Sequence, residues 1–320
     1  MDISFIIVNW NAIKYLSQCI ASIVENSQSF SYEIIVVDNA SSDGSPDIIK
    51  NQFPDIKVIC NGSNLGFAKA NNIGIRQSQG DFLCLVNSDV VVLKDSVDKL
   101  LAYIKSQPTI GMVGPQIIGI KGEIQRSCME HPTLSNMFAR AIAFNSVFPK
   151  SKLLGNYLMT DWEHDSLRRV DIINGCFWLI RKKALDKVGL LDEQFFMYGE
   201  DMDWCKRFWN NHWEISFYPD VKVIHYGGAS SANAPVRFYI EMHKANLKYW
   251  EKHHGAFSLY IFRCILLLHQ FIRLFGYLIR VISSPSKFSK DKVKIHRSFI
   301  SILFLLNIPI TNKTYNVASH

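Results

Sequence analysis

The sequence predicts an α/β fold with a mostly parallel central sheet, on the basis of two patterns. In the first hundred residues, short apolar segments rich in β-branched residues alternate with longer segments whose apolar residues recur at helical spacing. Small and polar residues follow each strand-like segment directly. Because strand-helix alternation connects parallel strands, we expect helices on both sheet faces and a ligand site beyond the carboxyl ends of the strands.

The predicted elements succeed one another regularly up to about Met112. The expected strands cover residues 3–8, 33–37, 56–60 and 82–86. The expected helices cover residues 13–24, a segment from Ser45 onward and about 68–78. The first helix places Leu16, Ile20, Ile23 and Val24 on one apolar stripe. The second begins at Ser45-Pro46-Asp47, where a capping hydroxyl, a proline and an early acid mark a helix start.

The second half of the sequence is less regular, and residues 121–171 follow no single period. Order returns at Asn174, after which we expect a strand at 175–180, a helix opening at 181–185, a helix from Glu200, and closing strands at 215–218 and 221–225. His225-Tyr226-Gly227-Gly228 should end the globular part. The chain is therefore divided into an α/β domain over 1–236 and a helical C-terminal region over 237–320.

Composition places the α/β part in a reducing compartment. The 320 residues, 48% hydrophobic and 20% charged, suffice for one large core plus an appendage or for two modest domains. The seven cysteines are scattered and show no C-x-x-C pair or metal-ligand spacing. Met1-Asp2-Ile3 leads straight into the first strand, without the features of a signal peptide. We therefore expect the α/β part to stay in the cytoplasm.

The net charge of +7 is unevenly distributed along the chain. Residues 1–236 carry 22 Lys and Arg against 25 Asp and Glu, whereas residues 237–320 carry 13 against 3. The first part is thus at about −3 and the tail at about +10. A basic tail of this kind binds either nucleic acid or an anionic membrane surface, and the residues around the charges decide between them.

The tail is apolar enough to favour the membrane over nucleic acid. Residues 256–284 are rich in Leu, Ile, Phe and Tyr but are interrupted by Arg263, His269, Arg273 and Arg280. A spanning helix needs about 20 apolar residues, so we expect an amphipathic helix lying in the interface. Five nearby basic side chains would meet anionic head groups, namely Lys287, Lys290, Lys292, Lys294 and Arg297. Residues 299–310 would add a second apolar segment. The alternative is a helical subdomain packed on the core or on another copy of the chain.

Carboxylates follow two of the predicted strands. Asn87-Ser88-Asp89 follows the fourth strand, where Asp89 would hold a divalent cation whose other positions take diphosphate oxygens and water. Alternatively, Asp89 caps a turn before the helix that begins at Ser96. Asp38 ends the second strand and would accept hydrogen bonds from a base or a ribose hydroxyl, or would form an Asx-turn within its loop. Asn64-Leu65-Gly66-Phe67 opens a helix, so its backbone NH groups are expected to face a phosphate or ribose.

The densest acidic cluster is Glu200-Asp201-x-Asp203, at a predicted helix start where the helix dipole favours ionised carboxylates. Asp203 and Arg207 should pair at i,i+4, while Asp201 points elsewhere and is a candidate base. A merely solvated helix end would fit poorly after the aromatic segment Phe195-Phe196-Met197-Tyr198. His225, at a strand end, is either a core or turn histidine or a second metal ligand.

As an ordered set, these motifs resemble glycosyltransferase family 2, and within it the bacterial rhamnosyltransferase-like enzymes of cell-surface polysaccharide assembly. The resemblance covers about residues 3–254. It rests on Val8-Asn9-Trp10-Asn11, the segment from Val37 to Ser45, Asn64-Leu65-Gly66-Phe67-Ala68, Asn87-Ser88-Asp89, Asp192-Glu193, Phe195-Phe196-Met197-Tyr198, Glu200-Asp201-x-Asp203 and His225-x-Gly227-Gly228.

The resemblance implies a nucleotide-diphospho-sugar transferase domain, that is, a GT-A-like fold. It makes Asp201 the general base and gives Mg²⁺ or Mn²⁺ to Asp89 and His225. The donor-binding residues would be Val8, Asn9, Asn11, Asp38, Asn39, Asn64, Gly66, Phe67, Asn71, Asn87 and Ser88. Trp10, Tyr198 and Glu200 would lie on the acceptor side. Asn87 stands where the family's D-x-D motif begins, as in a variant of this branch, and leaves fewer negative charges on the metal.

The implied reaction transfers a sugar, such as rhamnose, from a dTDP- or UDP-sugar to a hydroxyl of a lipid-linked or oligosaccharide acceptor. The diphosphate leaving group needs a cation and the hydroxyl needs a base, but no enzyme nucleophile is required, so the anomeric configuration should invert. Such an enzyme would be peripheral at the cytoplasmic face of a bacterial inner membrane. Formation of a homo-oligomer stays open.

Three other functions compete with this one. A dehydrogenase would need G-x-G-x-x-G after the first strand, where the sequence has Asn9-Trp10-Asn11-Ala12, and no P-loop occurs either. A sugar nucleotidyltransferase would need a first loop rich in glycine and arginine, which is absent. A non-catalytic scaffold for glycan assembly at the membrane would show no metal-dependent hydrolysis of a donor, whereas an enzyme should release nucleoside diphosphate slowly even without acceptor.

Overall fold

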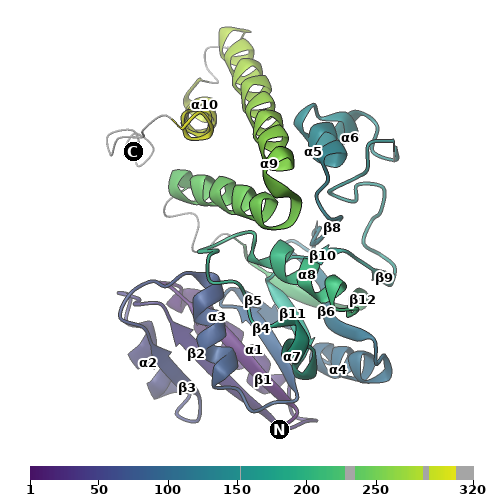
Figure 1. Ribbon diagram of the computed structural model, residues 1–320. Helices are drawn as coiled ribbons and strands as arrows, with labels where there is room; N and C mark the ends of the chain where they lie inside the picture. The colour runs from purple at the N-terminus through teal and green to yellow at the C-terminus, as the bar shows by residue number, and fades with distance from the viewer. Residues whose placement is uncertain (152, 228–234, 284–287, 308–320) are drawn as a thin grey trace. The chain divides into compact units, whose positions relative to one another are not determined.

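The computed structural model describes residues 1–151, 153–227, 235–283 and 288–307 (Figure 1). They form two compact units, an α/β unit and a helical unit. The α/β unit consists of Met1–His131, Trp162–Phe196 and Glu200–Ser230, and the helical unit of Pro132–Asp161, Met197–Gly199 and Ser231–His320. The irregular segment 121–171 is thus shared, because its middle part belongs to the helical unit. Gly228 of the last predicted motif lies outside the described residues.

The α/β unit is built on a ten-stranded sheet with the order β3-β2-β1-β4-β11-β6-β12-β5, in which β7 also pairs with β6 and β9 with β12. Its strands are β1 (Ile3–Asn9), β2 (Tyr32–Asp38), β3 (Lys57–Cys60), β4 (Phe82–Asn87), β5 (Val90–Val92), β6 (Ile110–Ile118), β7 (Ile124–Gln125), β9 (Arg168–Arg169), β11 (Phe177–Arg181) and β12 (Glu214–His225). A small antiparallel pair is formed by β8 (Cys128–Met129) and β10 (Ile172–Ile173).

The strand directions confirm the predicted α/β fold with a mostly parallel central sheet. Strands β3, β2, β1 and β4 run parallel, as do β6 and β12, whereas β11 lies antiparallel between β4 and β6. The two closing strands predicted from the sequence form one strand, β12. A register shift between Tyr218 and Lys222 interrupts its pairing with β6 without ending the strand, as a β-bulge does.

Helices cover both faces of the sheet, as the strand-helix alternation predicted. They are α1 (Ile13–Glu25), α2 (Ser45–Gln52), α3 (Phe67–Arg76), α4 (Ser96–Ser106), the short 3-10 turn η1 (Lys182–Ala184), α7 (Leu185–Val188) and α8 (Glu200–Asn210). The larger core cluster packs α1, α2 and α4 on one face through residues such as Leu16, Ile49 and Leu100. On the other face, Ala70 of α3 packs against Ile35 and Val37.

The loop before α2 differs from its prediction in detail. Ser45 is the first helical residue and not the cap; the cap position is Gly44, at φ 77°. The acid that matters is Asp43, which accepts hydrogen bonds from the Ser45 amide and from the Ile13 amide at 3.0 Å each. Asp43 therefore stabilises the first turns of both α1 and α2. The hydrogen bond from the Ser45 hydroxyl, followed by these backbone bonds, holds the pKa of the Asp43 carboxyl below the ordinary value against the opposing effect of burial.

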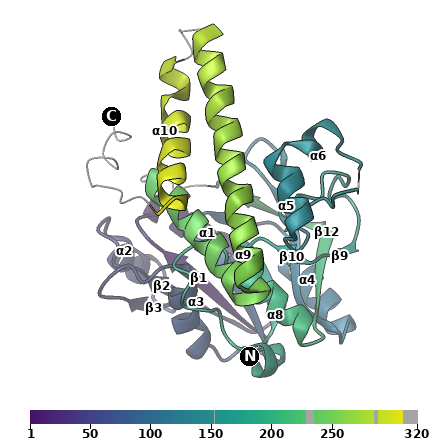
Figure 2. The ribbon, with the colours of Figure 1, turned by 45° about the horizontal axis from the view of Figure 1, so that its top comes forward.

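The helical unit consists of α5 (Leu134–Ala141), α6 (Phe144–Val147), α9 (Pro235–Ser283) and α10 (Phe288–Leu305). Helix α9 is bent at Gly255, whose φ of 76° divides it into a first limb, 235–254, and a second limb, 256–283. Figures 1 and 2 both show α10 beside the second limb, and we call this pair the C-terminal hairpin. Thr133 caps α5 through a capping box with Asn136.

Specific contacts hold this unit together. Arg263 in the second limb donates from Nε to the Leu305 carbonyl and from Nη2 to Asn307 Oδ1, both at 2.5 Å, and so clasps the end of α10. Trp250 stacks on Phe262 across the Gly255 bend, at 4.5 Å between ring centroids. His243 is buried in the first limb, and burial lowers the pKa of its imidazole to about 4, which keeps the ring neutral.

The length and composition of α9 bear on the predicted interfacial helix of the tail, which stays a prediction. The segment Tyr239–Ser283 is long and apolar enough to cross a membrane, with a mean hydropathy of 1.6 in its most apolar stretch, of which 11% is buried. The sequence prediction counted only uninterrupted charge-free residues and therefore judged the stretch too short. Length and composition are weak grounds for a span, since helices of soluble proteins also meet them.

Candidate active site

The ends of β1 and β2 are joined by hydrogen bonds between polar side chains. Asn9 and Asp38 lie opposite each other in the parallel pair. Asn9 Nδ2 donates to Asp38 Oδ1 at 2.8 Å, and Ser41 donates to Asp38 from its hydroxyl at 2.6 Å and from its amide at 2.9 Å. Both Asp38 oxygens thus accept bonds within the protein, so that the carboxylate is held in one orientation although it is buried.

Asn9 leaves one buried acceptor without a partner. Its Oδ1 atom is buried and accepts no hydrogen bond from the residues that the structure describes. An unmet acceptor of this kind costs about 1–3 kcal/mol, which a ligand that donates a hydrogen bond would recover. The end of β1 therefore encloses one acceptor that the described residues leave unsatisfied.

The loop after β1 is fixed against the loop after β2. The Asn11 amide donates to Ser41 Oγ at 2.9 Å, and Asn11 Oδ1 accepts from the Ser42 amide at 2.8 Å. Asn11 itself has a φ of 51°, which asparagine tolerates better than most residues. Val8 and Trp10, which flank Asn9, are partly buried. The first two loops therefore form one cross-linked edge.

Asn39 extends this edge to the third loop. Its Nδ2 atom donates to the Gly66 carbonyl at 3.1 Å, and its Oδ1 atom accepts from Asn61 Nδ2 at 2.9 Å. Asn61 and Ser41 were not among the predicted site residues, although both lie in the polar segments that follow strands. Asn61 reaches Asn39 across 22 positions and Ser41 reaches the Asn11 amide across 30, and no local pattern reveals such contacts.

Gly66 allows the third loop to approach the segment before α8. The Phe67 amide donates to the Phe196 carbonyl at 2.7 Å, and the Gly66 amide donates to Asn64 Oδ1 at 3.0 Å. Gly66 has a φ of 84°, and a Cβ atom there would lie 2.3 Å from the Phe196 oxygen, so only glycine fits. The two amides that were expected to face a phosphate thus have acceptors within the protein. Asn71 donates back to the Phe67 carbonyl at 3.0 Å.

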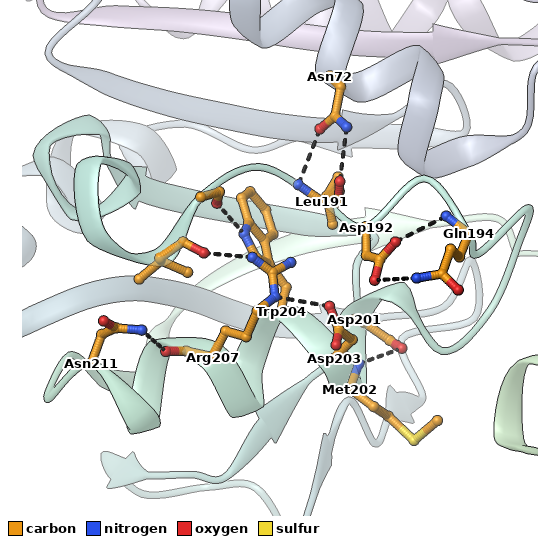
Figure 3. A network of polar contacts seen from close by, with 12 residues as sticks. Asn72, Leu191, Asp192, Gln194, Asp201, Met202, Asp203, Trp204, Arg207 and Asn211 are labelled. Atoms are coloured by element: carbon orange, nitrogen blue, oxygen red, sulfur yellow. Dashed lines mark hydrogen bonds and ion pairs between the residues drawn. The ribbon is translucent and has the colours of Figure 1, made fainter. Parts of the chain in front are cut away.

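Asn72, which the sequence did not single out, anchors the same segment from α3. Figure 3 shows its amide bonded to the backbone of Leu191, donating at 2.8 Å and accepting at 3.1 Å. Asn72 also donates to Glu193 Oε1 at 3.0 Å. The bond from Asn72, supported by Arg76, lowers the pKa of Glu193 below its ordinary value. The conformation of 191–196 is therefore fixed before the chain reaches α8.

The Asn87-Ser88-Asp89 segment brings Asp89 to His225. Asp89 lies between β4 and β5, and His225 ends β12, which pairs with β5. His225 Nε2 is 3.3 Å from Asp89 Oδ1. On its other side, His225 Nδ1 lies 3.0 Å from Gln125 Oε1, while Gln125 Nε2 donates to the His225 carbonyl at 2.9 Å. Gln125 was not predicted, and it orients the imidazole.

These contacts fit a divalent cation. If Nδ1 carries the proton that Gln125 Oε1 accepts, Nε2 presents a lone pair to the Asp89 carboxylate. The two acceptors would repel each other, and a cation bound by both would remove that repulsion. Two neighbouring ligands at about 2.1 Å from an octahedral ion lie roughly 3 Å apart, close to the observed separation. Among the described residues, no group of three or more His, Cys, Asp or Glu could hold a metal. The remaining positions would belong to a ligand and to water.

The two aspartates in the first turn of helix α8 have different surroundings. Asp203 is fully buried and accepts from Arg207 Nε at 2.9 Å, as the i,i+4 spacing predicted. Arg207 also donates to the Val188 carbonyl at 2.6 Å, and Trp204 Nε1 donates to the Gly189 carbonyl at 2.9 Å. Figure 3 shows Asp201 turned away from Arg207, with Oδ1 accepting from the Met202 amide at 2.8 Å. Asp203 therefore anchors α8, whereas Asp201 takes no part in the ion pair with Arg207.

Glu200 lies beside Asp201 and is buried. Burial, followed by the negative charge of Asp201, raises the pKa of the Glu200 carboxyl well above its ordinary value. Its Oε2 atom is buried and has no hydrogen-bond partner in the described part of the chain. Directly before it, Tyr198 and Gly199 have φ values of 66° and 80°. A non-glycine residue with positive φ is strained, and such strain is concentrated at functional sites.

The chain is similar in sequence to several characterised transferases. It is 27% identical over 234 residues to N-acetylglucosaminyl-diphospho-decaprenol L-rhamnosyltransferase of Mycobacterium tuberculosis, covering 70% of this chain and 76% of that protein. It is 25% identical over 268 residues to dTDP-rhamnosyl transferase RfbF of Shigella flexneri, covering 79% and 81%. A hexosyltransferase of low-salt glycan biosynthesis, Agl10 of Haloferax volcanii, is 28% identical and is matched over 70% and 67%.

Solved structures confirm the predicted fold. TarS 1–349 of S. aureus superposes with a TM-score of 0.52 at 19% identity, over 95% of this chain and 80% of that one. A mannosyltransferase of Pyrobaculum calidifontis, solved with GDP-Man and Mn²⁺, gives 0.52 at 14% identity, over 94% and 87%. Both likenesses concern the fold, which is the GT-A type. The model of the family described as glycosyl transferase family 2 matches residues 4–189, more than half of the sequence, and the chain therefore belongs to glycosyltransferase family 2.

Proposed function

We propose that this glycosyltransferase is metal-dependent and inverting, and that it moves a sugar from a nucleoside diphosphate donor to a lipid-linked glycan acceptor. The observation that carries the proposal is the Asp89-His225 pair, 3.3 Å apart and oriented by Gln125, at the same sheet edge as the Asn9-Asp38 pair. Asp89 follows β4, which neighbours β1, whereas His225 ends β12, which is separated from β4 by β11 and β6. Strands β4 and β12 run in the same direction, so both pairs lie at carboxyl ends of strands. Nucleoside and diphosphate would then bind side by side.

The nucleoside would bind at the ends of β1 and β2. Asp38 accepts hydrogen bonds there and Asn9 offers an unmet acceptor, so both favour a base or ribose that donates. Uracil and thymine each carry one NH donor that suits Asn9 Oδ1. A dTDP- or UDP-sugar is therefore the proposed donor, and the relative named as a dTDP-rhamnosyl transferase supports rhamnose as the sugar.

Asp89 and His225 would hold Mg²⁺ or Mn²⁺, with Asn87 and Ser88 beside them. A divalent cation there would neutralise the charge that develops on the departing diphosphate. Asn87 brings no charge of its own, so the protein supplies one carboxylate and one imidazole. The diphosphate of the donor would then contribute a large part of the affinity for the metal.

Asp201 would remove the proton from the acceptor hydroxyl as the hydroxyl attacks the anomeric carbon. Its carboxylate is at the first turn of α8, where the helix dipole favours the ionised form. The hydroxyl approaches the face opposite the leaving diphosphate, so a single displacement inverts the configuration. Buried Glu200 would keep its proton beside Asp201 and so avoid a second negative charge.

The acceptor and the location follow from the helical unit and the relatives. One relative is named for a decaprenol-linked acceptor. The helical unit exposes large apolar side chains along α9, which suits the surface of a membrane. We place the enzyme at the cytoplasmic face of the inner membrane as a peripheral protein, where lipid-linked glycans are accessible.

Release of nucleoside diphosphate without acceptor tests this proposal. The full-length protein should hydrolyse its donor slowly with Mn²⁺ or Mg²⁺, and EDTA should abolish the release. His225→Gln and Asp89→Asn should weaken Mn²⁺ binding, measured by calorimetry with the nucleoside diphosphate present, while Asp95→Asn, outside the pair, should not. Metal-independent hydrolysis would contradict the metal site, and the absence of hydrolysis with every dTDP- and UDP-sugar would favour a non-catalytic scaffold.

A further inference from the structure

The second limb of α9 carries an exposed face without charges. The side chains of Phe257, Leu268, Phe271, Phe275, Ile279 and Ile282 are all exposed. At about 100° per residue, these six fall within about 80° of arc along the whole limb, and we call them the apolar stripe. Arg263, Arg273 and Arg280 lie about 120° or more from the centre of that arc. The limb is therefore amphipathic, with its apolar side uncovered by the described residues of the helical unit.

Three cations meet on the other side of the hairpin, around one ring. Arg273 and Arg280 lie 5.8 and 5.9 Å from the Tyr277 ring centroid, and Lys294 of α10 lies 5.9 Å from it. No two of these charges can therefore be more than about 12 Å apart, so the three cations lie within reach of one anionic head group. Arg273 also donates from Nη2 to the Tyr277 hydroxyl at 2.9 Å. We call these four residues the Tyr277 cluster.

The other two arginines of the hairpin contact residues outside this cluster. Arg263 donates its hydrogen bonds to the Leu305 carbonyl and to Asn307 Oδ1. Arg297 lies over the Tyr239 ring, at 6.0 Å from its centroid. Over residues 256–307 the sequence has eight Lys and Arg against a single acid, Asp291. The positive charge of the hairpin therefore greatly exceeds what its own residues can neutralise.

We propose that the Tyr277 cluster binds the phosphate group of an anionic lipid while the apolar stripe lies in the acyl region of the bilayer surface. Arginine donates to phosphate in a bidentate manner, and a lysine adds a point charge. A helix is about 10 Å across, so a helix whose stripe rests on the acyl boundary carries its opposite side at the depth of the head groups. The inference rests on the proposed membrane location and gives it a specific ligand.

Charge distinguishes this occupant from the other candidates. A second copy of the chain would cover the stripe but would bring the same excess of positive charge. A helix that crosses the bilayer would carry Arg273 and Arg280 into the hydrocarbon, at about 2.5–3.5 kcal/mol each on insertion scales. An anionic surface covers the stripe and neutralises the cations together.

Flotation of the full-length protein with vesicles tests the proposal. The vesicles contain phosphatidylcholine alone or phosphatidylcholine mixed with phosphatidylglycerol. The triple variant Arg273→Gln, Arg280→Gln, Lys294→Gln should lose about 100-fold in affinity for the mixed vesicles, from about 1 kcal/mol per basic residue. It should bind phosphatidylcholine as the wild type does. The matched control Lys50→Gln, Lys99→Gln, Lys183→Gln removes three exposed charges from the α/β unit and should keep most of the affinity.

Each other outcome would overturn the inference. An equal loss of affinity in the control variant would mean that the effect depends on net charge alone. Unchanged flotation of the cluster variant would mean that the Tyr277 cluster is not a binding site. Displacement from mixed vesicles by equimolar inorganic phosphate would indicate a site for a free anion, and a dimer in sedimentation without flotation would assign the stripe to a second copy. Circular dichroism and donor hydrolysis without vesicles check the fold of each variant. If hydrolysis is absent but flotation behaves as expected, only the proposed function fails.

Discussion

The two units use their apolar and polar residues in opposite ways. Of the 22 large apolar side chains that are exposed among the described residues, 17 belong to the helical unit and five to the α/β unit, although the α/β unit is the larger. The α/β unit instead buries polar side chains at the ends of its strands, namely Asn9, Asp38, Asn39 and Asp89. Exposed apolar side chains and buried polar side chains are both unusual, and both are typical of sites that bind other molecules. The helical unit has the first feature and the α/β unit the second.

The polar contacts of the units differ in the same sense. In the α/β unit, the buried Asp38 carboxylate has partners that orient it, Asn9 and Ser41. In the C-terminal hairpin, three cations lie around the Tyr277 ring. Residues 256–307 contain a single acid that could neutralise them, Asp291. The first arrangement suits the proposed small ligand, and the second suits the proposed anionic surface.

The largest expected effect is on the turnover number and comes from a substitution in the α/β unit. Asp201→Asn should lower the turnover number about 10²–10⁴-fold, since a general base contributes about that factor, with the donor dissociation constant unchanged. Steady-state kinetics with the best donor and acceptor, together with calorimetry of nucleoside diphosphate binding, would measure both. Wild-type turnover in this variant would move the base to another residue and end the assignment of α8 to catalysis.

Arg207→Met should affect stability more than chemistry, since it leaves the buried Asp203 carboxylate without its ion pair. Breaking a buried pair costs about 3–5 kcal/mol, so the Tm should fall clearly in thermal unfolding. The matched control is Arg76→Met, whose pair with Glu193 is exposed and should cost at most about 1 kcal/mol. Equal shifts in the two variants would show that α8 is not held by this pair.

Gly66→Ala should disturb the donor site by way of the backbone. The added Cβ would meet the Phe196 carbonyl, and the φ of 84° would strain an alanine, at about 1–3 kcal/mol. The third loop must then leave segment 191–196, and we expect a higher KM for the donor. Gly62→Ala is the control, because no atom lies within 4 Å of its added Cβ. A normal KM in Gly66→Ala would exclude the loop from the donor site.

Glu200→Gln should change how stability depends on pH. The folded protein raises the pKa of Glu200 above the ordinary value of 4.5, so it holds that proton more tightly than the unfolded chain does. Stability is therefore lost as the pH rises from about 4.5 toward the raised pKa. The variant should match the wild type near pH 4 and exceed it at pH 8, by about 2–4 °C in Tm for each kcal/mol. Parallel Tm curves would show that Glu200 ionises freely.

The smallest expected effect concerns the apolar stripe. Phe275 is 66% exposed, so Phe275→Ser should change the free energy of unfolding in solution by no more than about 0.5 kcal/mol. Phe217 is fully buried in the α/β unit, and Phe217→Ala should cost about 3–5 kcal/mol. Chemical denaturation of both variants measures the difference. A large loss in Phe275→Ser would mean that the stripe is a core face.

The sequence predicted what depends on local patterns. Strand-helix alternation located β1, β2, β4 and α3 within one or two residues, and the i,i+4 spacing predicted the Asp203-Arg207 pair. It missed Asn72 and Gln125, whose partners lie about 100 or more positions away. It also left 132–161 unassigned, because the apolar residues of α5 pack on α9, which no local period can indicate.

The roles of single residues were also hard to predict where they depend on distant contacts. Asn64, Gly66 and Phe67 were correctly placed at a helix start, yet the Gly66 amide bonds to Asn64 Oδ1 and the Phe67 amide to the Phe196 carbonyl, which comes from a distant part of the chain. Ser45 was predicted as the cap from its neighbours, whereas Asp43 stabilises α2 and α1 together. Local chemistry identifies which residues are polar at a loop, and only tertiary contacts decide which atoms stay available for a ligand.

The position of β11 has a consequence for how the protein is made. This strand inserts between β4 and β6, so the middle of the sheet stays open until residue 181 has emerged from the ribosome. Until then the nascent chain exposes the edges of two apolar strands, which are templates for intermolecular pairing. Chains that stop before residue 177 should therefore aggregate during synthesis, and ribosomes that pause there should recruit chaperones.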